Sequence, residues 1–188
     1  MAVELSNEVR TALTAEQAQL KKLGARVAWA APGNMHITLL FLGDIFGAQV
    51  APLAAALDAV TAQHARFALA VVGLGWFGPP RSPRVVWAGV NDPDQKLAVL
   101  QKQTEEQARA LGLRTESRPF HPHLTLGRAQ PGGRATLPAL TRALEQAKNT
   151  VYGRCAVDGV RLMLSRLEAA GVCYSLLHEA KLKGTDHG

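Results

Sequence analysis

The pattern of apolar and polar positions along the chain predicts a mixture of helices and short strands. Apolar residues recur at helical spacing in four stretches, which predicts helices over residues 7–23, 48–64, 94–111 and 137–148. Short apolar runs predict strands at residues 3–5, 26–30, 36–42, 67–74, 85–90, 123–126, 154–164 and 172–182, and the last two are predicted to form a closing hairpin. Ser6 is a suitable N-cap for the first helix, and Gly24 is suited to end it.

The order of these elements indicates the fold class. Helices and strands alternate, but several strand pairs are joined by short loops, which argues against a purely parallel sheet. The sequence therefore predicts an α+β fold with antiparallel or mixed sheets. A chain of 188 residues can bury a real core, and we expect one domain over residues 1–183, followed by a loose tail at 184–188.

A tetrapeptide of the form His-x-Thr-Leu occurs twice, each time after a predicted helix and a turn. The copies are His36-Ile37-Thr38-Leu39 and His123-Leu124-Thr125-Leu126, 87 positions apart. From the abundance of Thr and Leu, two such matches among six histidines have a chance of roughly one in a thousand. The duplication predicts two related halves that face each other.

Strand geometry places the chemistry of each tetrapeptide on one surface. Side chains alternate along a strand, so each His and the Thr two positions later point the same way. The residues between and after them point into the opposite layer. Imidazole serves as acid or base near neutral pH, because its ordinary pKa is about 6.5. Two imidazoles on either side of a phosphate could pass protons in opposite directions, while Thr hydroxyls hold the phosphate oxygens.

Three other interpretations stay open at this point. A histidine in a strand is often a plain structural residue, although this leaves the duplication unexplained. A zinc site could use His121, His123 and His36, since imidazole suits zinc. Threonine is a poor zinc ligand, so a zinc site would leave the repeated Thr of the motif unexplained. The third is a non-catalytic RNA-binding module, and no recognisable nucleic-acid-binding motif supports it.

Composition narrows the class of partner and location. The formal net charge is +6 and the pI is about 9.7, which favours anionic partners such as nucleic acid or nucleotides. No apolar run is long enough to cross a bilayer, and the first residues lack the features of a signal peptide. We therefore expect a cytoplasmic protein without a membrane partner. No obligate protein partner is evident, and we expect a monomer.

The two tetrapeptides and their surroundings resemble the 2H phosphoesterases, and more narrowly the bacterial RNA 2′,3′-cyclic phosphodiesterases, also called 2′-5′ RNA ligases. The stretches that carry the resemblance lie across most of the chain. They are Asn34–Leu39, Phe41–Asp44, Arg84–Trp87 and, most specific, Arg118–Arg128. The resemblance implies two pseudo-symmetric lobes with helices outside and a central cleft, and it implies RNA processing without a cofactor or a metal.

The resemblance also implies roles for the motif residues. His36 would donate a proton to the leaving 3′ oxygen, and His123 would accept one from water, which gives a 2′-phosphate. Thr38 and Thr125 would bind the phosphate. The substrate would be RNA or a nucleotide with a 2′,3′-cyclic phosphate end. The alternative is the reverse reaction, 2′-5′ ligation of RNA ends such as tRNA halves, which needs the same groups.

Several residues near the motifs are further candidates for substrate contact. Arg128 and Arg118 could bind phosphate, and Phe77 or Trp76 could stack on a base. Phe41, five residues after His36, is expected to pack in the core if the strand stays regular.

Overall fold

The computed structural model describes residues 1–188 except 80, 117, 132–136, 169–170 and 185–188. The loose tail predicted for 184–188 thus lies outside the described residues from position 185 onward. The described helices are α1 (Asn7–Lys21), α2 (Gly47–Thr61), α3 (Lys96–Ala110), α4 (Leu137–Gln146) and the short 3₁₀ turn η1 (Pro32–Asn34). The described strands are β1 (Ala2–Val3), β2 (Val27–Trp29), β3 (Ile37–Thr38), β4 (Phe67–Phe77), β5 (Val85–Asn91), β6 (His123–Ala129), β7 (Val151–Val157), β8 (Gly159–Glu168) and β9 (Gly171–Lys181).

These strands form one nine-stranded sheet in the order β7-β4-β5-β6-β3-β1-β8-β9, with β2 paired to β6 beside this path. Neighbouring strands within the described residues pair in antiparallel register. The α+β class predicted from the sequence is confirmed. The two strands that carry the His-x-Thr-Leu motifs, β3 and β6, are neighbours at the centre of the sheet.

The order of elements before each motif strand is similar in the two halves. β1 is followed by α1, and after β2 and η1 the chain reaches β3, while β5 is followed by α3 and then β6. β1 pairs with β3, and β5 pairs with β6, so each motif strand has the strand of its own half on its outer side. The two related halves that the duplicated motif suggested stay a prediction.

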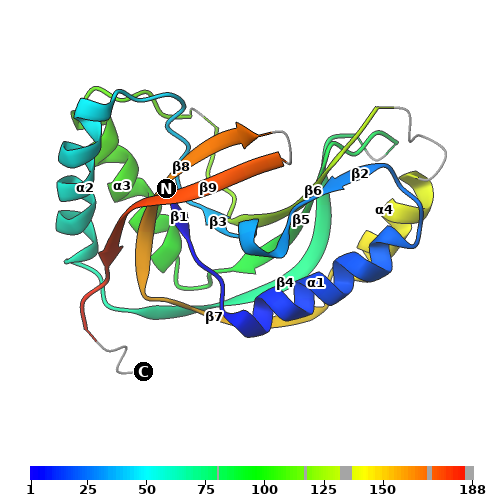
Figure 1. Ribbon diagram of the computed structural model, residues 1–188. Helices are drawn as coiled ribbons and strands as arrows, with labels where there is room; N and C mark the ends of the chain where they lie inside the picture. The colour runs from blue at the N-terminus through cyan, green and yellow to red at the C-terminus, as the bar shows by residue number, and fades with distance from the viewer. Residues whose placement is uncertain (80, 117, 132–136, 169–170, 185–188) are drawn as a thin grey trace.

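The helices lie at the two ends of the sheet (Figure 1), where they close the core. α1 packs against β7 and α4 against β4 at one end, and α2 packs against α3 and β9 at the other. Ser6 caps α1 as predicted, because its Oγ accepts a hydrogen bond from the N–H of Val9 at 3.3 Å. No helix of the described residues is long and apolar enough to cross a membrane.

The strand predicted for residues 154–164 is wrong as a single element. The structure divides it at Asp158 into β7 and β8, which pair with different strands. β7 pairs with β4 at one edge of the sheet, whereas β8 pairs with β9 near the other edge. The hairpin predicted at the end of the chain is therefore confirmed as β8–β9, and β7 completes the other half.

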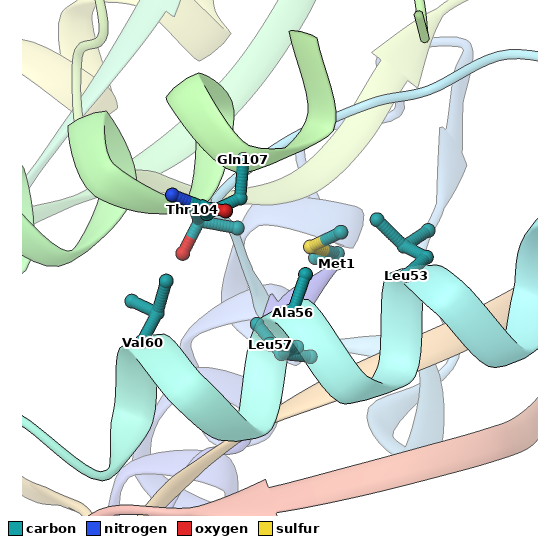
Figure 2. A pocket seen from close by; sticks show the side chains of 7 residues that line it. All are labelled: Met1, Leu53, Ala56, Leu57, Val60, Thr104 and Gln107. Atoms are coloured by element: carbon teal, nitrogen blue, oxygen red, sulfur yellow. The ribbon is translucent and has the colours of Figure 1, made fainter. Parts of the chain in front are cut away.

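The first residue helps to hold the chain beside the first motif. Figure 2 shows Met1 between α2 and α3, in a small hollow lined by Leu53, Ala56, Leu57, Val60, Thr104 and Gln107. The Met1 amino group donates a hydrogen bond to the carbonyl of Leu40 at 2.6 Å, and the N–H of Leu39 donates to the carbonyl of Met1 at 3.0 Å. The chain directly after Thr38 is thereby tied to the core.

Candidate active site

The four His and Thr residues of the motifs lie together on one face of the sheet. Ile37 of β3 pairs with Leu124 of β6 in antiparallel register. Extending this register by one residue in each direction places His36 opposite Thr125 and Thr38 opposite His123. The two histidines therefore lie on one diagonal of a square, with the two threonines on the other. Diagonal neighbours in a sheet are about 7–8 Å apart, which leaves room for one phosphate between the two imidazoles.

The two faces of this strand pair differ in exposure, as predicted. Ile37 and Leu124 are fully buried, in the same apolar cluster as Leu13 of α1 and Leu100 of α3. On the other face Thr38 is exposed, and His36, His123 and Thr125 are half-buried. The imidazoles and hydroxyls are thus held on a packed layer and remain accessible to a ligand from solvent.

Both imidazoles make the same backbone hydrogen bond. His36 Nδ1 lies 2.9 Å from the carbonyl oxygen of Asn34, and His123 Nδ1 lies 2.7 Å from that of His121. A carbonyl oxygen can only accept, so each Nδ1 carries the hydrogen. Each neutral ring therefore leaves Nε2 without a proton and free to exchange one with a ligand. Any proton transfer between these rings and a ligand would therefore take place at Nε2.

Burial and nearby charge together favour the neutral form of His36. Burial lowers the pKa of His36 below its ordinary value, because desolvation disfavours the charged ring. The hydrogen bond to Asn34 opposes this effect, and the positive chain terminus adds a smaller lowering of the pKa. Without an anion nearby, the His36 ring is more readily neutral than a histidine in solution.

An aromatic ring from an outer hairpin packs against each imidazole. Phe77 of β4 meets His123 edge-on, with ring centroids 4.9 Å apart and an interplanar angle of 90°. Tyr174 of β9 meets His36 in the same manner at 5.0 Å and 84°. Phe77 also contacts the Trp87 ring at 5.5 Å. Such edge contacts favour one ring orientation over others.

A β-bulge brings Arg128 to the same face as the motifs. Strand alternation alone would turn Arg128, five positions after His123, to the opposite face. Its partner is Val85, whereas Thr125 pairs with Trp87, and the register shifts by one residue between these pairs. Val85 and Trp87 are two apart on β5 and share a face, so the extra residue on β6 returns Arg128 to the side of Thr125. The Arg128 side chain is exposed there.

Trp76, another candidate, does not lie on this face. Trp76 pairs with the buried Val86 and packs against the core, on the side opposite to Phe77. Arg118 is exposed and forms an ion pair with Glu116. The expectation for Phe41 is wrong: its side chain is 63% exposed, because β3 ends at Thr38 and the alternation does not continue.

Sequence reasoning missed Tyr174 and the side chain of Asn34. The Asn34 amide donates a hydrogen bond to the carbonyl of Val172 on β9 at 2.8 Å. Tyr174 carries no motif, and its place at the site depends on how the closing hairpin curls, which no local pattern reveals. Asn34 lies two residues before His36, and this closeness in sequence was the one feature that could have pointed to it.

The zinc alternative requires three ligands close together. Among the residues that the structure describes, no group of three or more His, Cys, Asp or Glu side chains is placed to hold a metal ion. His121 contributes its backbone carbonyl to His123.

Known proteins are similar to this chain in sequence and in fold. The family model of LigT like phosphoesterases matches residues 3–87 and 89–174. A protein of Aquifex aeolicus named RNA 2′,3′-cyclic phosphodiesterase is 32% identical over 95% of this chain and 92% of its own length. One of Aeropyrum pernix with the same name is 34% identical over 79% of this chain and 82% of its length. A Geobacillus stearothermophilus relative of that name is 36% identical over 81% of this chain, which matches 48% of that longer protein.

Solved structures agree with these relatives. A crystal structure of a Thermus thermophilus protein has a TM-score of 0.80 at 25% identity, covering 99% of this chain and 97% of its own. The crystal structure of Escherichia coli LigT complexed with 3′-AMP has a TM-score of 0.72 at 27% identity, covering 97% of this chain and 96% of its own. With two His-x-Thr-Leu strands paired at the centre of the sheet and a family match over most of its length, the chain belongs to the LigT like phosphoesterases, as its motifs indicated.

Proposed function

We propose that this protein hydrolyses the 2′,3′-cyclic phosphate of RNA or nucleotides to a 2′-phosphate. The observation that supports this most directly is the square of His36, Thr125, His123 and Thr38 on one open face. Its two Nε2 atoms are available for proton transfer because both Nδ1 atoms donate to backbone carbonyls. The relatives named RNA 2′,3′-cyclic phosphodiesterase, with the positive net charge, favour an RNA substrate.

The reaction divides two proton transfers between the two rings. A water oxygen attacks phosphorus while His123 Nε2 takes its proton, and the bond from phosphorus to the 3′ oxygen breaks. His36 Nε2, protonated beforehand, gives its proton to that 3′ oxygen, which leaves a 3′-hydroxyl and a 2′-phosphate. Exchange with solvent then restores the proton on His36 and removes the one on His123.

Hydroxyls and one cation support the phosphate in this arrangement. Thr38 and Thr125 lie beside the histidines and can each donate a hydrogen bond to a non-bridging oxygen, where charge develops. Arg128, returned to this face by the bulge, supplies a guanidinium suited to phosphate. Phe77 packs against His123, and we propose that it contacts the nucleoside.

The negative charge of a bound substrate helps His36 to hold the proton that it needs as an acid. Burial lowers the pKa of His36 in the free protein, which disfavours the protonated ring. A bound phosphodiester is anionic, and an opposite charge within about 4–6 Å favours the imidazolium. The acid therefore forms when substrate binds. The cytoplasmic location and the monomeric state expected from the sequence stay predictions.

The test is turnover of 2′,3′-cyclic nucleotides and of a short RNA with a cyclic end, in the presence of a chelator. We expect hydrolysis by the wild-type protein, and a loss of at least 100-fold, roughly the contribution of one general acid or base, in His36→Ala and in His123→Ala. His64→Ala is the matched control, because His64 is hydrogen-bonded to Gln103 of α3 outside the motif face. Unchanged turnover in either motif variant would refute the mechanism.

Product analysis separates the remaining possibilities. A 2′-phosphate with a free 3′-hydroxyl is the expected product, and a 3′-phosphate would contradict the assigned bond cleavage. Supplying an RNA with a 5′-hydroxyl as well would reveal 2′-5′ ligation by the same groups. RNA binding that survives loss of both histidines, without turnover of any cyclic phosphate, would instead favour the binding module.

A further inference from the structure

We propose that Asn34 and Tyr174 are positioning residues that connect the β8–β9 hairpin to His36 and hold its imidazole in the orientation needed for proton transfer. The inference rests on the proposed function for its kinetic part. Neither residue belongs to a motif, and neither needs to touch the reacting atoms.

Asn34 joins two structures through two different groups. Its backbone carbonyl accepts the hydrogen bond from His36 Nδ1 at 2.9 Å, and its side-chain amide donates to the carbonyl of Val172 on β9 at 2.8 Å. Asn34 is the last residue of the η1 turn, whose Pro32 carbonyl accepts a hydrogen bond from Arg10 of α1 at 2.6 Å. The turn that orients His36 is thus held from α1 on one side and from the hairpin on the other.

Tyr174 reaches His36 because the hairpin curls over the motif face. β9 is three strands from β3 in the sheet order. At a spacing of about 4.8 Å, a flat sheet would separate these strands by about 14 Å. The ring centroids of Tyr174 and His36 are only 5.0 Å apart. Figure 1 shows the β8–β9 hairpin crossing the centre of the molecule near β3.

Neighbouring side chains on β9 differ in which face of the hairpin they occupy. Tyr174 pairs with Ser165, and the neighbouring Ser175 points to the opposite face because strand side chains alternate. Tyr174 is half-buried whereas Ser175 is exposed. The aromatic ring is therefore directed to the imidazole.

The second histidine is held differently, which makes the inference specific. Phe77, the aromatic partner of His123, lies on β4, two strands away through β5. The carbonyl that accepts from His123 belongs to His121, and among the residues that the structure describes no hydrogen bond joins His121 to a hairpin. A change in the β8–β9 hairpin should therefore disturb His36 and leave His123 as it is.

The experiment compares Tyr174→Leu, Tyr174→Phe and Asn34→Ala, with Ser175→Ala as the matched control on the other face of β9. Ring ¹⁵N NMR of the ligand-free protein reports the tautomer and titration of His36 and His123 separately, and steady-state kinetics gives kcat and KM for a 2′,3′-cyclic nucleotide. For Tyr174→Leu and Asn34→Ala we expect loss of the pure Nδ1–H tautomer of His36 and a fall in kcat of roughly 10- to 100-fold at similar KM. Tyr174→Phe and Ser175→Ala should match the wild-type protein.

The outcomes distinguish this proposal from the proposed function. If the wild-type protein turns over no cyclic phosphate, the proposed function fails, and the NMR of His36 still decides the positioning. Wild-type His36 signals in both Tyr174→Leu and Asn34→Ala would overturn the proposal. Equal disturbance of His36 and His123 would also overturn it, because that result indicates a general structural role.

Discussion

Gly75 lies directly opposite Trp87 in the β4–β5 pair, and the Trp87 indole occupies the space that a side chain at position 75 would need. An ideal Cβ at Gly75 would overlap the indole ring. The indole in turn contacts Phe77, whose ring packs against His123. A glycine outside the motifs therefore determines where the ring beside His123 lies.

Gly75→Ala should reduce both stability and activity. The added methyl group must displace the Trp87 indole, and overpacking of this kind typically costs about 1–3 kcal/mol of unfolding free energy. The displaced indole should move Phe77 and thereby His123, so kcat should fall as well. Denaturant unfolding and cyclic nucleotide turnover measure the two effects.

Gly47→Ala is the control for this substitution. A Cβ at Gly47 would meet no atom within 4 Å, and this glycine begins α2. Alanine should therefore be neutral or slightly stabilising there. If Gly75→Ala were equally harmless, the indole would not be confined in the way that the structure indicates.

Arg128→Gln should weaken the use of anionic substrate without affecting the fold. The β6 bulge places the exposed Arg128 on the motif face, and hydrogen bonds to charged groups contribute about 1.5–3 kcal/mol. We expect kcat/KM to fall roughly 10- to 100-fold, in line with that energy. The unfolding midpoint should stay the same, since the side chain is exposed.

Arg142→Gln removes the same charge from an exposed position on α4, the helix that packs against β4. It should leave kcat/KM close to the wild-type value. An equal loss in both variants would point to net charge rather than to a contact made by Arg128.

The sequence was sufficient to predict which motif side chains share a face, because strand alternation is local. Strand alternation alone predicts that His and Thr share a face with Ile37 and Leu124 behind them, and the burial of these two residues agrees. The α+β class follows in the same way from helix periodicity and short connections. The pairing of β3 with β6 is not local, and the duplication of the motif predicted only two related halves that face each other, not strands paired in one sheet.

Features that depend on register or on long-range curling could not be predicted. The bulge that turns Arg128 is one additional residue in β6, which alternation cannot detect. Tyr174 reaches His36 only because the hairpin curls, and β7 and β8 separate at Asp158 within what reads as a continuous strand. Phe41 was misplaced because β3 ends after two residues, where the Met1 amino group and carbonyl take over the backbone hydrogen bonds.

Gln17→Ala should destabilise the fold near the second motif. Gln17 of α1 is 1% exposed, and its amide donates to the carbonyls of Ala30 and Leu126, the latter at 2.8 Å. Removing the Gln17 amide deprives the Ala30 carbonyl of this hydrogen bond and opens a small cavity. We expect a loss of about 1–3 kcal/mol in unfolding free energy, measured by urea denaturation.

Gln19→Ala provides the comparison within the same helix. Gln19 is exposed, and its side chain accepts a hydrogen bond from Lys22 at 2.8 Å. Its replacement should change the unfolding free energy by less than about 0.5 kcal/mol. Alanine favours helix more than glutamine does, so helix propensity does not cause a loss at either position. Similar losses in the two variants would mean that the link between α1 and β6 does not explain the effect.

Titration of His36 should respond to phosphate in a direction that the structure determines. Burial lowers its pKa below the ordinary 6.5, so in the free protein the ring should lose its proton at a lower pH than a histidine in solution. Folding then disfavours protonation of His36. Its contribution to stability is present above pH 6.5 and declines as the pH falls through the lowered pKa.

Inorganic phosphate between the two histidines should raise the pKa of His36, because an anion favours the imidazolium. Ring ¹H–¹⁵N NMR with and without phosphate measures both values. A free-protein pKa at or above the ordinary value, or one that phosphate leaves unchanged, would contradict the mechanism in which substrate binding prepares His36 as the acid.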